Sequence, residues 1–132
     1  MKDFTQELKT KIQEMESALR IQRENLVRED TSIFESRNLE FYAEFDIDGS
    51  NHFQPGYCST ICIGIADKID PDGERINLHV ITIWNCARII FGLSVSKNIP
   101  GSKIIGDLVD ESLKEIKKEL KETIEEFLSE EY

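Results

Sequence analysis

Residues 39–47 read LEFYAEFDI, and this short stretch decides the fold class. Its apolar side chains recur at every second position, and acidic or tyrosine side chains separate them. The apolar positions are Leu39, Phe41, Ala43, Phe45 and Ile47. An alternation with period two is typical of a β-strand with one buried and one solvated face. The sequence therefore predicts a strand here, followed by the turn-forming residues DGSN at 48–51.

Three further segments downstream have the composition of strands. They are YCSTICIGIAD at 57–67, ERINLHVITIW at 74–84 and ARIIFGLSV at 87–95. Together with the first strand and the turn signal DPDG, they predict an antiparallel meander over residues 38–96. One face of the 57–67 segment carries only small side chains, which let another layer or a ligand approach the backbone closely. The last two strands are apolar on both faces, so we expect a cover on each face of the sheet, from helices or from another subunit.

The first part of the chain has helical periodicity. Five apolar residues and one polar residue follow in steps of three and four: Leu8, Ile12, Met15, Leu19, Gln22 and Leu26. Asp3 is the expected cap of this helix, which we place over residues 3–29. A heptad seam of this kind packs either on the protein's own sheet or on a second copy of the helix. The periodicity leaves both arrangements open.

Helical spacing returns after KNIPGS at 97–102, where apolar residues form one broad stripe. Ser102 is the expected cap of a helix over residues 102–130. The sequence thus predicts a single α+β domain over residues 1–132. Its elements are an N-terminal helix, a four-stranded antiparallel meander sheet and a long C-terminal helix.

The balance of charge restricts the classes of partner. With 16 basic and 26 acidic residues, the chain has a formal net charge of −10 at pH 7. Such a charge repels duplex nucleic acid and acidic membrane surfaces. No apolar run approaches the roughly 20 residues that a membrane span needs, and the N-terminal residues lack the apolar stretch of a signal peptide. We therefore expect a cytoplasmic protein that binds neither duplex nucleic acid nor membranes.

Motifs for metals, cofactors and catalysis are incomplete. A loop counted from Asp46 resembles a calcium loop, but Asn51 stands at the sixth position, where glycine is needed, and Tyr57 at the twelfth, where glutamate is needed. Cys58 and Cys62 lie four residues apart on one predicted strand, roughly 13 Å from each other and too far to share a zinc ion. No glycine-rich phosphate loop is present either. We expect no metal, no cofactor and no enzymatic activity.

The segment ITIWNCARIIFG at 81–92 holds the densest mix of aromatic, amide and guanidinium groups. Trp84 and Phe91 offer flat apolar surfaces for a base or for a side chain of a partner. Asn85 offers a polar edge, and Arg88 offers a charge for an anion, together with arginines of the first helix. The predicted ligand-binding residues are Arg20, Arg23, Arg28, Trp84, Asn85, Arg88 and Phe91. The alternative is that the aromatic residues fill the core and the arginines form surface salt bridges.

Three segments carry a resemblance to a known family: RIQREN at 20–25, CARIIFGLS at 86–94 and IPGSKIIGDLVDESL at 99–113. In size, element order and general character the chain resembles the phage Thoeris anti-defence sponges, small oligomeric proteins that capture cyclic ADP-ribose-derived signals made by bacterial TIR enzymes. The resemblance implies a homo-oligomer that buries a nucleotide-like anion without turnover, with arginines on the diphosphate and aromatic residues on the base. It also implies the host-cell cytoplasm as the location if the protein is encoded by a phage.

A different class of function also fits the composition. An acidic surface steers association with a basic partner and mimics a phosphate backbone. The chain would then be a protein-binding inhibitor, such as an immunity protein, an anti-CRISPR protein or a secretion chaperone. In that case Glu122, Glu125 and Glu126 of the C-terminal helix are candidates for the contact.

Overall fold

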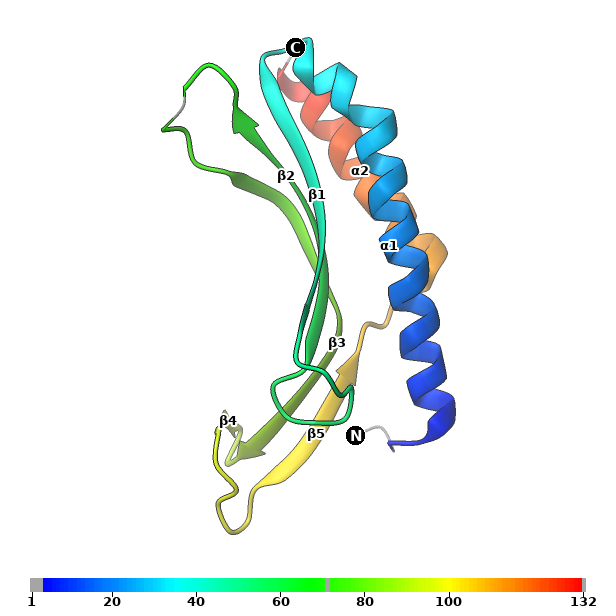
Figure 1. Ribbon diagram of the computed structural model, residues 1–132, viewed down its shortest axis with the longest axis vertical. Helices are drawn as coiled ribbons and strands as arrows, with labels where there is room; N and C mark the ends of the chain where they lie inside the picture. The colour runs from blue at the N-terminus through cyan, green and yellow to red at the C-terminus, as the bar shows by residue number, and fades with distance from the viewer. Residues whose placement is uncertain (1–3, 71, 132) are drawn as a thin grey trace.

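The computed structural model describes residues 4–70 and 72–131 and has an α+β architecture (Figure 1). In chain order its elements are α1 (Gln6–Glu35), β1 (Leu39–Asp48), β2 (Cys58–Asp67), β3 (Ile76–Ile90), β4 (Leu93–Ser94), β5 (Lys103–Leu108) and α2 (Leu113–Glu131). Every strand pair is antiparallel, and β1 to β4 are neighbours in chain order. The predicted fold class and the meander are confirmed.

A fifth strand stands where the beginning of the C-terminal helix was expected. β5 pairs with β3 on the edge opposite to β2 and β4, with Trp84 opposite Leu108 and Ile89 opposite Lys103. The prediction of a helix over residues 102–130 was therefore wrong for its first part. The physical reason is that this edge of β3 offers backbone hydrogen-bonding groups, and β5 satisfies them.

The cap of α2 moves accordingly from Ser102 to Ser112. The Ser112 hydroxyl accepts a hydrogen bond from the Glu115 amide, and the Glu115 carboxylate accepts one from the Ser112 amide, both at 3.2 Å. This reciprocal pair is a capping box, which satisfies amide groups that have no partner inside the helix. Ser102 instead accepts a hydrogen bond from Arg88.

The two strands expected at 74–84 and 87–95 form one strand of 15 residues, β3. The residues between them contain neither glycine nor proline and stay paired with β5. The turn lies further on, at Phe91 and Gly92, whose φ angles of 51° and 77° are both left-handed. A two-residue turn of this kind matches the twist of a hairpin, so β4 is left with two residues.

Two register shifts between β2 and β3 explain why β3 is apolar at neighbouring positions. They lie between Ser59 and Thr60 and between Ile63 and Gly64. A bulge inserts one extra residue and so resets the alternation of faces. As a result Ile83 and Trp84 follow one another in the sequence, yet both are fully buried.

The helix α1 begins later and ends later than expected. Thr5 is its N-cap and accepts a hydrogen bond from the Leu8 amide at 3.1 Å, whereas Asp3 lies outside the described residues. The helix continues to Glu35, past the expected end at residue 29. The central positions of the heptad seam are buried, namely Ile12, Met15, Leu19, Gln22 and Leu26. They lie against the sheet, so the seam packs on the protein's own strands.

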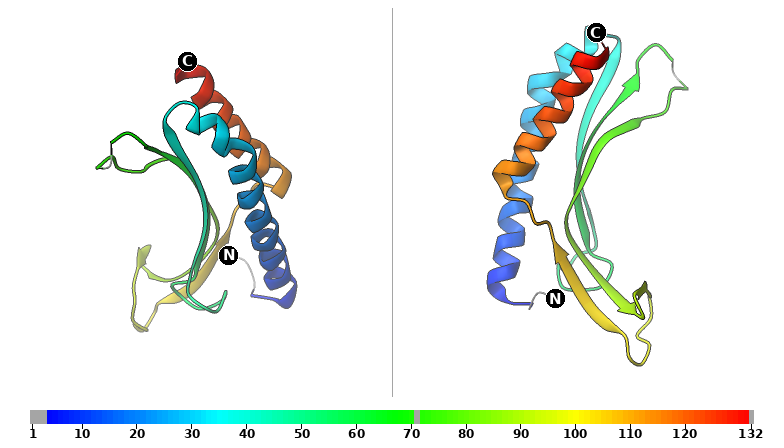
Figure 2. Two further views of the ribbon diagram at one scale, coloured as in Figure 1. Left: turned by 45° about the horizontal axis from the view of Figure 1, so that its top comes forward. Right: turned by 180° about the vertical axis from the view of Figure 1, so that it is seen from behind.

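Both helices lie on the same face of the sheet (Figures 1 and 2). Between this face and the helices lies one apolar core, to which α1, α2 and the strands β1, β2, β3 and β5 contribute. The expected cover on each face is therefore present on one face only, within the described residues. The sheet bows so that the β2–β3 hairpin and the end that carries β4 both project away from the helices (Figures 1 and 2). The uncovered face is the concave one.

Candidate functional site

Trp84, one of the predicted ligand-binding residues, belongs to the core. It is fully buried, and its indole Nε1 donates a hydrogen bond of 2.6 Å to the backbone carbonyl of His52. Phe4 and Phe53 each meet its ring edge to face, with centroids 6.1 Å away. On the neighbouring strand only a glycine fits beneath the ring, because a Cβ at Gly106 would lie 2.1 Å from an indole carbon. Trp84 is therefore a packing residue, as the core alternative supposed.

Phe91 is the opposite case. Its side chain is 95% exposed at the turn between β3 and β4. Trp84 and Phe91 thus do not share one pocket. Exposure of this degree leaves the Phe91 ring available to a ligand or a partner, since it makes no contribution to the core.

Asn85 and Arg88 are brought together. Both line a cavity of about 570 Å³ beside the edge of β3, together with Pro55, Gly56, Cys86, Ala87, Ser94, Val95 and Ser96. One guanidinium nitrogen of Arg88 donates to Asn98 Oδ1 at 3.1 Å and to Ser102 Oγ at 3.2 Å. Both acceptors are uncharged, and no carboxylate lines the cavity. The cavity therefore combines one positive charge with hydroxyl and amide groups.

The three arginines selected on α1 lie apart from that cavity, and each makes a different contact. The Arg20 guanidinium stacks on the Phe45 ring, 5.1 Å from its centroid. Arg23 donates a 2.6 Å hydrogen bond to the carbonyl of Ala43. Arg28 is exposed and bonds to Asn25, one turn away. Arg20 and Arg23 line a shared cavity of about 290 Å³, but three acidic residues line it too, namely Glu24, Glu44 and Asp46.

A buried polar network escaped the sequence analysis. Glu16 on α1 is 5% exposed, and its two carboxylate oxygens are bound by His52 Nε2 at 2.8 Å and by the Tyr57 hydroxyl at 2.7 Å. Burial, followed by this bond to Glu16, raises the pKa of Tyr57. The only signal in the sequence was an acidic residue beside the heptad seam, and its two partners lie 36 and 41 residues further along the chain.

The network borders a cavity of about 630 Å³ between α1 and the β1–β2 connection. Arg20 lines this cavity with Gln13, Glu16, Ser17, Ile47, Gly49, Ser50, His52 and Tyr57. Both Glu16 oxygens are occupied, so the network holds the helix to the connection and presents His52 and Tyr57 at fixed positions. The carboxylate reduces the attraction of this cavity for an anion.

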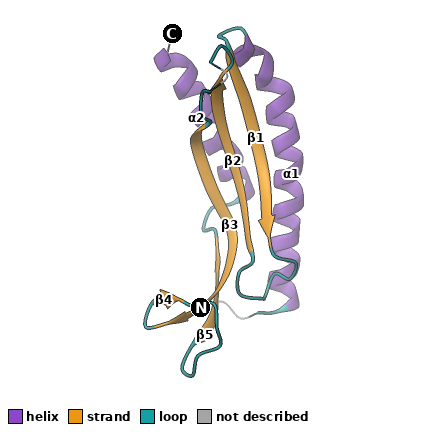
Figure 3. Ribbon diagram, turned by 60° about the vertical axis from the view of Figure 1, so that its left-hand side comes forward, coloured by secondary structure: helices purple, strands orange, loops and turns teal. Residues whose placement is uncertain are grey.

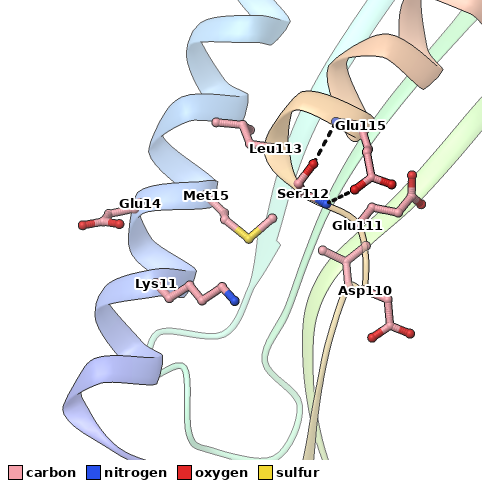
Figure 4. Close-up of a pocket in the computed structure, with 9 residues that line it drawn as sticks. Lys11, Glu14, Met15, Asp110, Glu111, Ser112, Leu113 and Glu115 are labelled. Atoms are coloured by element: carbon pink, nitrogen blue, oxygen red, sulfur yellow. Dashed lines mark hydrogen bonds between the residues drawn. The ribbon is translucent and has the colours of Figure 1, made fainter.

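The cavity in Figure 4, of about 490 Å³, lies where α1 approaches the connection between β5 and α2. Four acidic residues line it, namely Glu14, Asp110, Glu111 and Glu115, against one cation, Lys11. A further cavity between the C-terminal parts of α1 and α2 is lined by three acidic residues and Lys121. Neither composition suits an anionic ligand.

A second acid and imidazole pair fastens α2 to β3. His79 Nε2 lies 2.8 Å from Glu119 Oε1. The pKa of Glu111 is raised and that of Glu119 is lowered, in each case first by the hydrogen bond between these two carboxyl groups. The group has the contacts of a structural clamp, with no nucleophile among them.

One cluster in the described residues has the proximity of metal ligands. Single ligand atoms of Glu44, Asp46 and Cys62 lie within 4.8 Å of one another on the uncovered face of the sheet. Glu44 is also paired with Arg75. Glu44 is directly opposite Cys62, and Asp46 is two residues further along β1 on the same face. This placement brings the three side chains together without an ion, so the expectation of no metal stays a prediction.

Neither helix in the described part of the chain combines the length and the apolar character needed to cross a membrane. Comparison of the chain with protein-family models, with curated proteins and with solved structures found no match.

Proposed function

We propose that this protein is a non-catalytic binding protein that sequesters a small anionic, nucleotide-type ligand, and that the ligand binds in the cavity lined by Asn85 and Arg88. Cyclic ADP-ribose-type signals are the ligands that the resemblance to the Thoeris sponges suggests. One observation carries the proposal: in a chain of net charge −10, this cavity has an arginine and no carboxylate in its lining.

The chemistry of the lining supports an anion. An arginine guanidinium has five N–H donors, and uncharged acceptors engage Arg88 through a single nitrogen. The remaining donors suit the paired oxygens of a diphosphate. Ser94, Ser96 and the Asn85 amide add hydrogen-bonding groups at the same cavity. Its volume of about 570 Å³ lies within the range of roughly 300–1,000 Å³ that small-molecule sites occupy.

Of the two aromatic residues expected to stack on the base, we retain only Phe91. Trp84 is buried and has no free face, so it is excluded from stacking on a ligand. Phe91 is the exposed aromatic residue on the same hairpin, and we assign it the stacking role in the proposal. Stacking on one aromatic ring contributes about 1–3 kcal/mol per base.

A thermal-shift screen tests the proposal. The purified protein is heated with inorganic pyrophosphate, ADP-ribose, cyclic ADP-ribose isomers and cyclic dinucleotides. A ligand present at 100 times its dissociation constant stabilises the folded protein by about 2.7 kcal/mol, which raises the melting temperature by several degrees. Chromatography after the experiment should recover that ligand unaltered, because the proposed function involves no turnover.

A matched pair of variants locates the site. Arg88→Glu should abolish the shift, whereas Arg28→Glu, with the same change of charge on an exposed helix position, should retain it. Phe91→Ala should weaken binding of nucleotides but leave binding of pyrophosphate unchanged. Flat melting curves across the panel, or equal losses in the two arginine variants, would contradict the proposal.

The proposal extends to location and assembly. We place the sequestration in the cytoplasm, where nucleotide signals accumulate, and in a homo-oligomer. Because the heptad seam packs on the sheet, assembly through α1 has to use its outward side, where Ile21 and Ile33 are exposed by 60% and 43%. Light scattering on the wild type and on Ile21→Glu tests this contact.

A further inference from the structure

The concave face of the sheet, which neither helix covers, has a distinct set of side chains. Along β1 it carries the side chains that alternate with the core residues, namely Glu40, Tyr42, Glu44, Asp46 and Asp48. Opposite them on β2 lie Ala66, Gly64, Cys62, Thr60 and Cys58. Neither helix reaches this face (Figure 3). It is therefore the one broad surface of the described sheet that the fold leaves open.

The face is closed at one end and open at the other. At the closed end the Tyr42 ring lies over Gly64, where a Cβ would come within 2.3 Å of it, and its hydroxyl donates to Asn77 on β3. The Arg75 guanidinium covers that ring, 4.4 Å from its centroid, and pairs with Glu44. Beyond this lid the small residues of β2 form the floor.

At the open end, the floor lies between two rows of longer side chains. Asp46 and Asp48 on β1 are directly opposite Thr60 and Cys58 on β2. On the other side of the floor Cys58 is opposite Asn85, which in turn is opposite Asp107 on β5. These acidic residues are all exposed. The result is a strip of small side chains along β2, which we call the furrow, with Asp46 and Asp48 beside it on β1 and Asp107 two strands away on β5.

From this arrangement we infer that the concave face of the sheet is a docking surface for a lysine- and arginine-rich segment of a partner protein. Charge complementarity selects this occupant. The described cations of the face are Arg75, which is paired with Glu44, and Lys103 near the far end of β5. A second copy of the chain would bring the same excess of carboxylates and few cations, so like charges would oppose its docking. Asn85 lies beside both the furrow and the anion cavity, but the inference requires no ligand in that cavity.

The cysteines provide a built-in reporter. Cys58 and Cys62 lie on the floor of the furrow and are partly exposed, whereas Cys86 is fully buried. Burial and the neighbouring carboxylates raise the pKa of both floor thiols, so labelling with a maleimide is done at mildly alkaline pH. A segment seated in the furrow should protect these two thiols, and Cys86 should stay unlabelled throughout.

The experiment measures binding of a short amphipathic peptide of lysine, leucine and alanine, with a glutamate-for-lysine peptide as the control and EDTA present to remove metal ions. The lysine peptide should bind and should block labelling of Cys58 and Cys62, whereas the glutamate peptide should do neither. The double variant Asp46→Lys, Asp48→Lys should raise its dissociation constant by about tenfold or more, since it reverses two exposed charges. The neutral pair Asp46→Asn, Asp48→Asn should have a smaller effect in the same direction.

The control variant is Glu14→Lys, Glu130→Lys on α1 and α2, which changes the net charge by the same amount at exposed positions away from the concave face. It should bind the peptide as the wild type does. Equal losses in the two reversed variants would mean that only net charge matters and would overturn the inference. So would the absence of binding, or binding without protection of the thiols. Protection that grows with the protein's own concentration, with a doubled mass in light scattering, would assign the face to a second copy instead.

Discussion

The contact between Trp84 and Gly106 shows how one missing methyl group determines the packing of two strands. A Cβ at Gly106 would lie 2.1 Å and 2.5 Å from two carbons of the indole ring. We expect Gly106→Ala to reduce the free energy of unfolding by about 1–3 kcal/mol, because overpacking displaces a buried ring. Urea denaturation measures the loss. In a Trp84→Phe background, which lacks both indole carbons, the same substitution should cost less, and an equal cost would contradict this account.

The Tyr57 hydroxyl should make the free energy of unfolding vary with pH in the alkaline range. In the folded protein burial and the bond to Glu16 raise its pKa above the ordinary value of 10.0. Above about pH 10 the unfolded chain therefore releases this proton while the folded protein keeps it, so the free energy of unfolding should fall as the pH rises. Tyr57→Phe should flatten this decline in part, since Tyr42 also has a raised pKa.

The same variant has a cost at neutral pH. Without the hydroxyl, one oxygen of the buried Glu16 carboxylate loses its donor, so we expect Tyr57→Phe to lose about 1–3 kcal/mol of stability at pH 7. Urea denaturation at pH 7 and at several values above pH 9 measures both effects. A pH dependence identical to that of the wild type would show that Tyr57 titrates normally.

At the scale of elements, α1 has one face buried against the sheet and one face exposed. Leu19 is fully buried against the sheet, and Ile21 is 60% exposed on the outward side. We expect Leu19→Ala to reduce the free energy of unfolding by about 2–5 kcal/mol and to leave the oligomeric mass unchanged. Ile21→Ala should change stability by less than about 0.5 kcal/mol. A change of mass in Leu19→Ala, measured by light scattering, would instead indicate that the seam pairs with a second copy.

For the whole molecule, the excess of acidic residues opposes the folded state. Ten net negative charges repel one another in a compact chain, and salt screens them, with a Debye length that falls from about 30 Å at 0.01 M to about 8 Å at 0.15 M. We expect sodium chloride over this range to raise the melting temperature. A relief of 1 kcal/mol corresponds to roughly 3–5 °C for a chain of this length.

The less acidic variant Glu125→Lys, Glu126→Lys provides the control for the salt effect. Its self-repulsion is weaker, so it should gain less from added salt than the wild type does. A melting temperature that falls with salt in the wild type would mean that attractive ion pairs, such as that of Arg75 and Glu44, outweigh the repulsion.

The local sequence pattern predicted the elements that have one buried and one solvated face, because apolar and polar residues alternate there with the period of the element. The alternation of residues 39–47 predicts β1, because one face of that strand meets the core and the other meets solvent. The steps of three and four from Leu8 to Leu26 predict α1 for the same reason, since one stripe of a helix is buried. Of the candidate site, the sequence predicted that Asn85 and Arg88 lie near each other, because they are three residues apart in one segment, and both line the same cavity.

The tertiary structure alone decided what depends on contacts between distant segments. Residues 103–108 form a strand because an edge of β3 is available to them, although their spacing also suits a helix. Trp84 is buried because Phe4 and Phe53 come to its ring from elsewhere in the chain. The placement of both helices on one face, which leaves the acidic furrow open, depends on loop geometry and on the bow of the sheet. Periodicity records that a residue is buried, and it does not record which segment buries it.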